Sequence, residues 1–168
     1  MGYKNLPFGS AEKFNVVIEI PKGSQNKYEY DEELDLMKLN WVFTGDFKFE
    51  YDYGFVSRTR GGDGDMLDAF VFCSHPLEHG VVVKCRAIGM IELLDRSEVD
   101  NKILAVAIKD PNYINVQELT DLDIDYETEF RKFFKELGRQ KNKVMEIMGF
   151  RDRATAEKEL EAAHKNYK

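Results

Sequence analysis

The stretch that says most about the fold is Gly80–Leu94, with the sequence GVVVKCRAIGMIELL. It is rich in valine at its start, and β-branched residues favour extended structure. The stretch is long for one strand and is interrupted by Gly89. A glycine inside a strand pattern is typical of a bulge or bend. We therefore predict one long strand that bends near position 89.

Shorter strand patterns lie on both sides of this stretch. The apolar run FNVVIEI at 14–20 is stopped by Pro21 and Gly23, as expected for a strand. Further apolar or alternating segments occupy 27–31, 36–43, 53–59, 68–73 and 102–108. About seven short strands separated by turn residues indicate a β-barrel or sandwich rather than βαβ units.

The last third of the chain changes to a helical pattern. Apolar residues between positions 126 and 137 recur on one helical face, with Asp125 as the expected N-cap and Gly138 as the expected stop. A strand is expected at 143–150. Asp152 then caps a second helix whose inward positions are Ala156, Leu160, Ala163 and Tyr167. With no linker or repeat, residues 1–168 are predicted to form a single α+β, mainly β, domain: a barrel with two outer helices.

Composition excludes several classes of protein. The chain has 168 residues, 43% of them hydrophobic, which argues against intrinsic disorder. Lys and Arg number 24 against 31 Asp and Glu, a net charge of −7, so a generic nucleic-acid or anionic-membrane binder is not expected. No stretch has the apolar length of a membrane span. Cys73 and Cys85 are too few for a disulfide framework, so a cytoplasmic location is predicted.

The segment RGGDGDMLD at 60–68 holds the strongest chemical signal. It carries Asp63, Asp65 and Asp68 just before a predicted strand. Three neighbouring carboxylates repel one another unless protons or cations neutralise them. Magnesium prefers oxygen ligands, so a glycine-flexed aspartate cluster suits it. The alternative is a solvated acidic turn, which would be favoured if this motif stood alone.

Two other groups could join this cluster. Asp95 and Asp100 lie in the connection before Lys102, where two carboxylates and an anion-binding ammonium could meet; the alternative is an ordinary charged hairpin loop. Glu19 lies within an apolar run, where an unpaired carboxylate is costly to bury; the alternative is an edge-strand side chain that points to water.

A further charged pair is spaced two residues apart on one strand. Lys27 and Glu29 therefore share a face of that strand. A surface ion pair of little energetic value is the alternative explanation.

These groups follow one another in the order of a known family. The matching motifs are Val16–Pro21 with Glu19, Lys27-x-Glu29, Tyr53-Gly54, Asp63-x-Asp65-x-x-Asp68 and Asp95-x-x-x-x-Asp100-x-Lys102. Over residues 14–167 the chain resembles the family I soluble inorganic pyrophosphatases of the short prokaryotic type. The resemblance implies an OB-like five-stranded β-barrel with two outer α-helices and additional hairpin strands.

The resemblance also implies roles for individual residues. The substrate would be inorganic diphosphate, hydrolysed by a metal-activated water with two or more Mg²⁺ ions per site, in a homo-oligomer that is often a hexamer. The implied metal ligands are Asp63, Asp68, Asp95, Asp100, Glu19 and Glu29. Asp65 would take the proton of the attacking water, and Tyr53 would help shape the site. Lys27 and Lys102 would bind diphosphate oxygens.

The chain departs from the family pattern on the side of the attacked phosphate. Trp41 stands where the family has an arginine, Phe49 where it has a tyrosine, and Leu137-Gly138 where it has a Tyr-Lys pair. Candidate replacements for the missing cations are Arg58, Arg60, Arg139 and Lys141. Diphosphate hydrolysis is the leading hypothesis; the alternatives are another phosphoanhydride or phosphoester as substrate, or an inactive metal- or phosphate-binding homologue.

Overall fold

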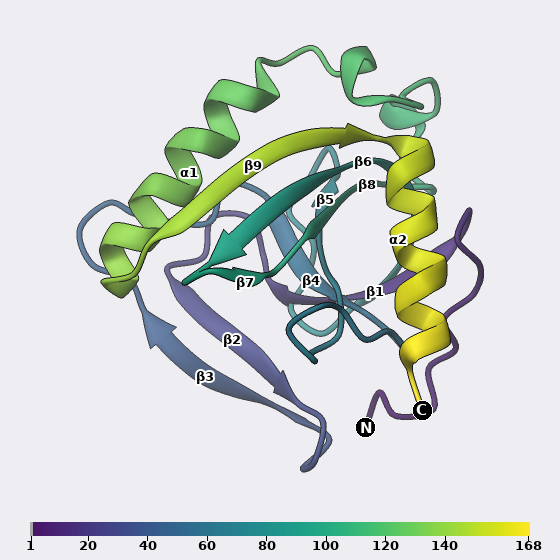
Figure 1. The fold of residues 1–168 in the computed structure, drawn as a ribbon, viewed down its shortest axis with the longest axis horizontal. Helices are drawn as coiled ribbons and strands as arrows, with labels where there is room; N and C mark the ends of the chain where they lie inside the picture. The colour runs from purple at the N-terminus through teal and green to yellow at the C-terminus, as the bar shows by residue number, and fades with distance from the viewer. Residues whose placement is uncertain (1) are drawn as a thin grey trace.

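Five strands close into a barrel in the computed structural model, which describes residues 2–168. They are β1 (Phe14–Ile20), β4 (Asp52–Val56), β5 (Asp68–Phe72), β6 (Val82–Asp95) and β8 (Lys102–Ala107). The sheet runs in the order β1-β4-β5-β8-β6, and β6 pairs back with β1 (Figure 1). Only β5 and β8 are parallel within this ring. The expected OB-like five-stranded barrel is confirmed.

The long strand β6 bends where the sequence predicted it would. Its register against β8 shifts between Ala87 and Gly89, which is the signature of a bulge. A Cβ atom at Gly89 would lie 2.4 Å from Cγ of Leu119, so the close approach of this neighbour requires glycine. Beyond the bulge, β6 pairs with β9 (Met145–Asp152) and with the short strand β7 (Glu98–Val99).

A hairpin stands apart from the barrel. Strands β2 (Asn26–Asp31) and β3 (Leu36–Val42) form their own two-stranded antiparallel sheet, which extends to the lower left in Figure 1. The turn between them includes Asp35 in the left-handed conformation, at φ 54°. Most of β3 is exposed, whereas every residue of β1 is buried.

Two α-helices complete the fold, α1 (Tyr126–Lys141) and α2 (Arg153–Asn166). Asp125 and Asp152 cap them as predicted, because their carboxylates accept hydrogen bonds from the backbone N–H groups of Thr128 and Thr155. Two short 3₁₀-helices, Pro111–Tyr113 and Leu119–Asp121, precede α1. Within residues 2–168, no helix is long and apolar enough to cross a membrane.

Some predicted element boundaries were wrong. Gly138 does not stop α1, which continues for three more residues to Lys141 and ends at Asn142 in the left-handed conformation. Asparagine tolerates that conformation, and the N–H of Lys143 then donates to the carbonyl of Gly138 at 2.9 Å. Strand β4 ends at residue 56 rather than 59, and β9 lies two residues later than expected. Tyr167 lies just beyond α2.

The helices bury their apolar faces in two clusters. Ala156, Leu160 and Ala163 of α2 pack with barrel residues in one cluster. Residues of α1, including Phe130, Phe133 and Phe134, form the other with aromatic side chains that include Phe49 and Phe70. Aromatic packing beneath α1 therefore fixes its C-terminal end relative to the barrel.

Candidate functional site

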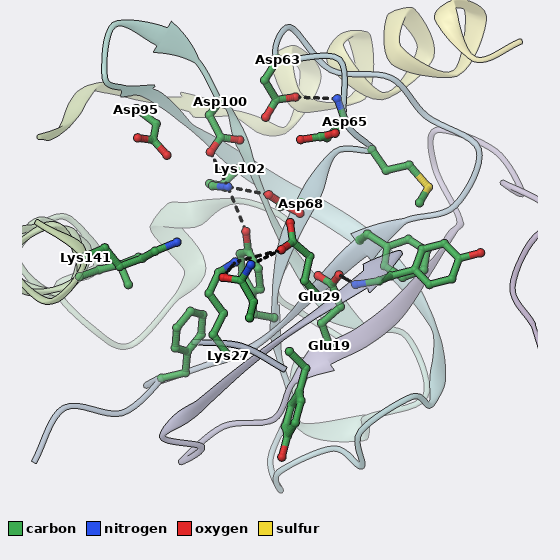
Figure 2. Close-up of a pocket in the computed structure, with 18 of the residues that line it drawn as sticks. Glu19, Lys27, Glu29, Asp63, Asp65, Asp68, Asp95, Asp100, Lys102 and Lys141 are labelled. Atoms are coloured by element: carbon green, nitrogen blue, oxygen red, sulfur yellow. Dashed lines mark hydrogen bonds and ion pairs between the residues drawn. The ribbon is translucent and has the colours of Figure 1, made fainter. Parts of the chain in front are cut away.

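Every residue to which the family resemblance assigned a role lines one pocket. Its volume is about 660 Å³. The predicted residues that line it are Glu19, Lys27, Glu29, Tyr53, Asp63, Asp65, Asp68, Asp95, Asp100 and Lys102. Figure 2 shows the aspartates above the centre of this pocket and the glutamates and Lys27 below it. Their roles in chemistry stay predictions, but their common location is a property of the fold.

The register of the barrel brings the centre of the pocket together. Asp68 begins β5 and Lys102 begins β8, and the two residues are direct partners across the parallel pair. Tyr53 lies on β4, the other neighbour of β5. Side chains at the starts of two parallel strands point from the same edge of a sheet, which is why residues distant in sequence meet here.

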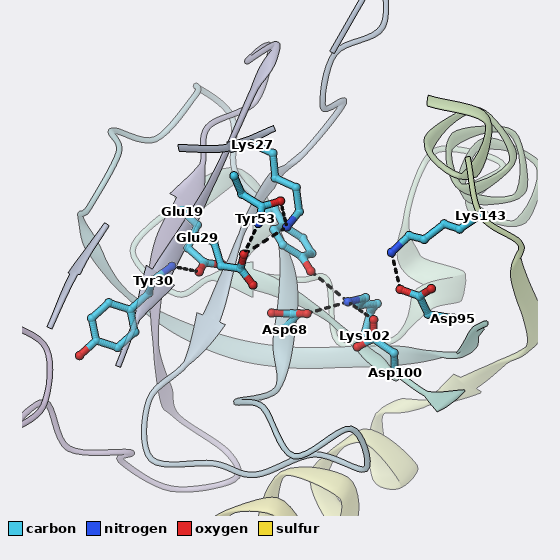
Figure 3. Close-up of polar contacts among 11 residues, drawn as sticks. Glu19, Lys27, Glu29, Tyr30, Tyr53, Asp68, Asp95, Asp100, Lys102 and Lys143 are labelled. Atoms are coloured by element: carbon cyan, nitrogen blue, oxygen red, sulfur yellow. Dashed lines mark hydrogen bonds and ion pairs between the residues drawn. The ribbon is translucent and has the colours of Figure 1, made fainter. Parts of the chain in front are cut away.

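Lys102 lies buried in the middle of the pocket, and only 4% of its surface is exposed. Its Nζ donates to Asp68 Oδ2 at 2.6 Å, to Asp100 Oδ2 at 2.9 Å and to the Tyr53 hydroxyl at 3.0 Å (Figure 3). Burial by itself would lower the pKa of Lys102, but the negative charges of Asp68 and Asp100 raise it well above its usual value. The ammonium therefore stays charged inside the pocket.

The loop that carries the other aspartates is shaped by a local turn. The Asp63 carboxylate accepts a hydrogen bond from the backbone N–H of Asp65 at 3.0 Å, and Gly64 between them takes a φ of 87°. This left-handed conformation favours glycine, so the turn accounts for Asp63 and Gly64, whereas Asp65 contributes only its backbone N–H. Burial, and then the charge of Asp68, raise the pKa of the Asp65 carboxyl.

Glu19 is buried on β1 rather than turned to water, so the edge-strand alternative is wrong. Only 6% of the residue is exposed, and its Oε1 accepts a hydrogen bond from the N–H of Tyr30 at 2.8 Å. Burial raises the pKa of Glu19 to about 8, and the charge of Asp68 acts in the same direction. The carboxyl groups of this pocket thus repel one another in the absence of a cation.

The β2–β3 hairpin forms one wall of the pocket. Asn40 of β3 joins the two charged residues of β2: it accepts a hydrogen bond from Lys27 Nζ at 3.2 Å and donates one to Glu29 Oε2 at 2.6 Å. Lys27 and Glu29 are themselves 3.9 Å apart. Asn40 was missed by the sequence interpretation because it lies at a register shift of the hairpin, and only the folded strand pair brings its side chain between these two residues.

The last residue of α1 and the turn after it each supply a lysine. Lys143 Nζ lies 2.5 Å from Asp95 Oδ2, and Lys141 lines the pocket with its Nζ 5.6 Å from the centre of the Trp41 ring. Lys143 had no signal in the sequence, because its position depends on how the chain turns at Asn142.

The other candidate cations do not line the pocket. Arg139 pairs with Glu136 on the surface of α1, and Arg60 pairs with Glu32. Arg58, in the left-handed conformation, is also absent from the lining. Lys141 is therefore the one sequence candidate that reaches the pocket, among the residues that the structure describes.

The donor set fits a hard divalent cation in its chemistry. The candidate ligands are carboxylates, and Asp95 Oδ1 is buried without a hydrogen-bond partner. Within residues 2–168, no three of the potential ligands already converge on one point. The ammonium of Lys102 lies between Asp68 and Asp100, and its single positive charge offsets only one of their two negative charges.

Comparisons with known proteins agree on one family. The family model described as inorganic pyrophosphatase matches residues 16–168. An inorganic pyrophosphatase of Synechocystis is 40% identical over 92% of this chain and 91% of that protein. One of Thermoplasma volcanium is 43% identical over 90% of this chain and 92% of its own length.

The overall structure gives the same result. The crystal structure of inorganic pyrophosphatase from Thermus thermophilus superimposes with a TM-score of 0.91 at 37% sequence identity, over 99% of both chains. The similarity thus extends over the barrel, the hairpin and both helices.

Proposed function

Because the chain belongs to the inorganic pyrophosphatase family, we propose that it hydrolyses inorganic diphosphate to two phosphates in the pocket described above. The observation that carries the proposal is the convergence of the predicted carboxylates with Lys27 and Lys102 on one cavity. Carboxylates alone would repel an anion, so the substrate must bind together with cations.

We assign the cation sites to Mg²⁺, with two or more ions per active site. The family is generally metal-dependent. The residues proposed to hold the ions are Asp63, Asp68, Asp95, Asp100, Glu19 and Glu29. Bound Mg²⁺ would neutralise the carboxylates, lower the pKa of coordinated water and offset charge on the phosphate oxygens. The raised pKa of Glu19 supports this assignment, and so does Asp95 Oδ1, which has no hydrogen-bond partner and lies 3.5 Å from Arg96 Nε.

Lys27 and Lys102 bind diphosphate oxygens in this proposal. Lys102 keeps its charge because Asp68 and Asp100 stabilise the ammonium, so its positive charge is present at neutral pH and can donate a hydrogen bond to a diphosphate oxygen when cations take over the two carboxylates. Lys27 is held by Asn40 and Glu29 at the hairpin wall. Tyr53 shapes the floor, because its hydroxyl accepts a hydrogen bond from Lys102 and its ring is buried.

Asp65 accepts the proton of the attacking water in this proposal. A general base works best when its pKa approaches the operating pH. Burial and the charge of Asp68 move the pKa of Asp65 in that direction. The Asp-Gly-Asp turn holds its backbone, so the point from which the carboxylate projects is set before substrate binds.

Release of phosphate from diphosphate tests the proposal. The unmodified chain should release phosphate only with Mg²⁺, and Asp65→Asn should lower kcat by about 100-fold or more, the range for loss of a general base. Asp46→Asn, on an exposed loop, is the matched control and should behave as the unmodified chain. No Mg²⁺-dependent release at high enzyme concentration would refute the proposal. Faster turnover of a nucleotide or phosphoester than of diphosphate would redirect it to another substrate.

Three further features are part of the same proposal. Residues 1–168 form a single domain, supported by the family match and the closed sheet. The location is cytoplasmic, supported by the two free cysteines. The chain forms a homo-oligomer such as a hexamer, supported by exposed apolar residues on β3, including Leu39 and Val42. Light scattering after size-exclusion chromatography tests the oligomer.

A further inference from the structure

We propose that Lys141, supported by the ring of Trp41, binds the phosphate group that receives the attack. The inference rests on the proposed function and names the residue that completes its substrate site. The family pattern does not place a cation at position 141.

The positions where the family pattern places phosphate-binding groups cannot supply a cation in this chain. Leu137 is buried and apolar within the aromatic cluster under α1. Gly138 follows it, and a Cβ atom there would lie 2.7 Å from the carbonyl oxygen of Lys143. The turn that ends α1 therefore disfavours a side chain at position 138. The third position is Trp41, which has no charge.

Lys141 differs from the other cations of the pocket in having no carboxylate partner. The lysines and arginines in the lining are Lys27, Lys38, Arg96, Lys102, Lys141 and Lys143. Among the described residues, all except Lys141 have a carboxylate oxygen within ion-pair distance. An ammonium without a counter-ion, at the edge of a cavity, is available to an anionic ligand.

The hairpin and the helix together direct this ammonium into the site. Trp41 is the strand partner of Lys27 in the β2–β3 pairing, and Lys141 Nζ lies 5.6 Å from the centre of its ring. A cation over an indole face is attracted by the ring quadrupole, so Trp41 holds Lys141 on the same side of the pocket as Lys27. Figure 2 shows the Lys141 side chain extending from the helix toward the centre of the pocket.

The charges around Lys141 favour the binding of an anion. Burial, followed by the positive charges of Lys27 and Lys143, lowers the pKa of Lys141 to about 8. Lys27 and Lys143 therefore lie near enough to Lys141 for their charges to repel its ammonium, although Lys143 also pairs with Asp95. A phosphate group between them would relieve their repulsion, while the aspartates and their cations hold the other end of the diphosphate.

Trp41 provides the reporter for a binding test, because it is the only tryptophan in the chain. Diphosphate with Mg²⁺ is titrated into Asp65→Asn protein, in which turnover is slow, and both tryptophan fluorescence and calorimetry are recorded. Lys141→Met should weaken diphosphate binding about tenfold or more, the usual effect of removing a charge-assisted contact. It should also abolish the ligand-dependent change in Trp41 fluorescence.

Two variants separate charge from structure. Lys141→Arg keeps the charge and should bind within about threefold of the parent, a far smaller loss than that of Lys141→Met. Lys135→Met removes an exposed lysine from the same helix and should change neither readout. If Lys141→Met does not fold, Lys141→Gln takes its place.

The inference is overturned if the uncharged variants at 141 bind diphosphate as tightly as Lys135→Met. It is also overturned if Lys141→Arg is as impaired as Lys141→Met. Failure of the proposed function is a separate result, namely no Mg²⁺-dependent phosphate release by the unmodified chain. The binding titrations still decide the role of Lys141 in that case.

Discussion

Replacing Lys102 by methionine should destabilise the metal-free protein strongly and specifically. Lys102 is 4% exposed and lies within 3.0 Å of two carboxylates and one hydroxyl. Methionine fills a similar volume but leaves Asp68 and Asp100 beside each other without their shared cation. This substitution therefore tests whether the Lys102 ammonium allows Asp68 and Asp100 to lie close together in the folded protein before metal binds.

The size of the effect follows from burial. Removing one partner of a buried ion pair costs about 3–5 kcal/mol. The side chains of Asp68 and Asp100 keep 22% and 16% of their surface exposed, so water relieves part of the repulsion. We therefore expect the lower end, about 3 kcal/mol, which corresponds to a fall in Tm of about 6–12 °C for a chain of this length.

Urea unfolding with EDTA and with Mg²⁺ measures this prediction. Lys102→Met should lose about 3 kcal/mol in EDTA, and Mg²⁺ should restore more stability to it than to the unmodified chain, since a cation can neutralise the same carboxylates. The double variant with Asp68→Asn should recover part of the loss, because one stranded charge is removed. Lys135→Met serves as the control for loss of an exposed lysine.

A loss below about 1 kcal/mol for Lys102→Met in EDTA would refute this reasoning. So would additive effects of Lys102→Met and Asp68→Asn, because two groups that interact directly must show a coupling energy.

Two other predictions concern stability. The unfolded chain releases the Glu19 proton near pH 4.5, whereas the folded protein retains it up to about pH 8, so metal-free stability should fall as pH rises between these values. Glu19→Gln should flatten that slope in urea titrations at several pH values; an unchanged slope would contradict the raised pKa. A Cβ at Gly54 would lie 1.8 Å from the Val17 carbonyl oxygen, against 2.7 Å for the Gly138 contact. Gly54→Ala should therefore cost more than about 3 kcal/mol and Gly138→Ala about 1–2 kcal/mol by thermal unfolding, and the reverse ranking would be inconsistent with these contacts.

The helix caps and the bend in β6 could be read from local sequence because each depends on nearby backbone geometry. Asp125 and Asp152 satisfy N–H groups three residues away. The bend required a glycine in a long apolar run, and Gly89 is such a residue. The end of α1 could not be read in this way. Gly138 has the residue type of a helix stop, yet the left-handed residue is Asn142, because the chain must turn there to start β9.

Some residues of the candidate site could likewise be identified from the sequence, and others could not. The carboxylates and Lys102 occur in short motifs whose residue types are unusual for a core or a plain loop, so they could be found in sequence. Asn40 and Lys143 could not, because each is an ordinary surface residue type. Strand pairing and the turn after α1 place them at the pocket.

The residue pattern alone predicted a mainly β fold with a group of carboxylates and two lysines suited to cations and an anion. These properties follow from residue types, spacing and the order of motifs along the chain. The folded arrangement was needed to show that Lys102 is shared by Asp68 and Asp100, and that Glu19 is buried close enough to Asp68 to feel its charge. It also decided that Lys141, rather than Arg139, reaches the pocket. Those outcomes depend on strand register and helix length, which arise from packing between segments far apart in the chain.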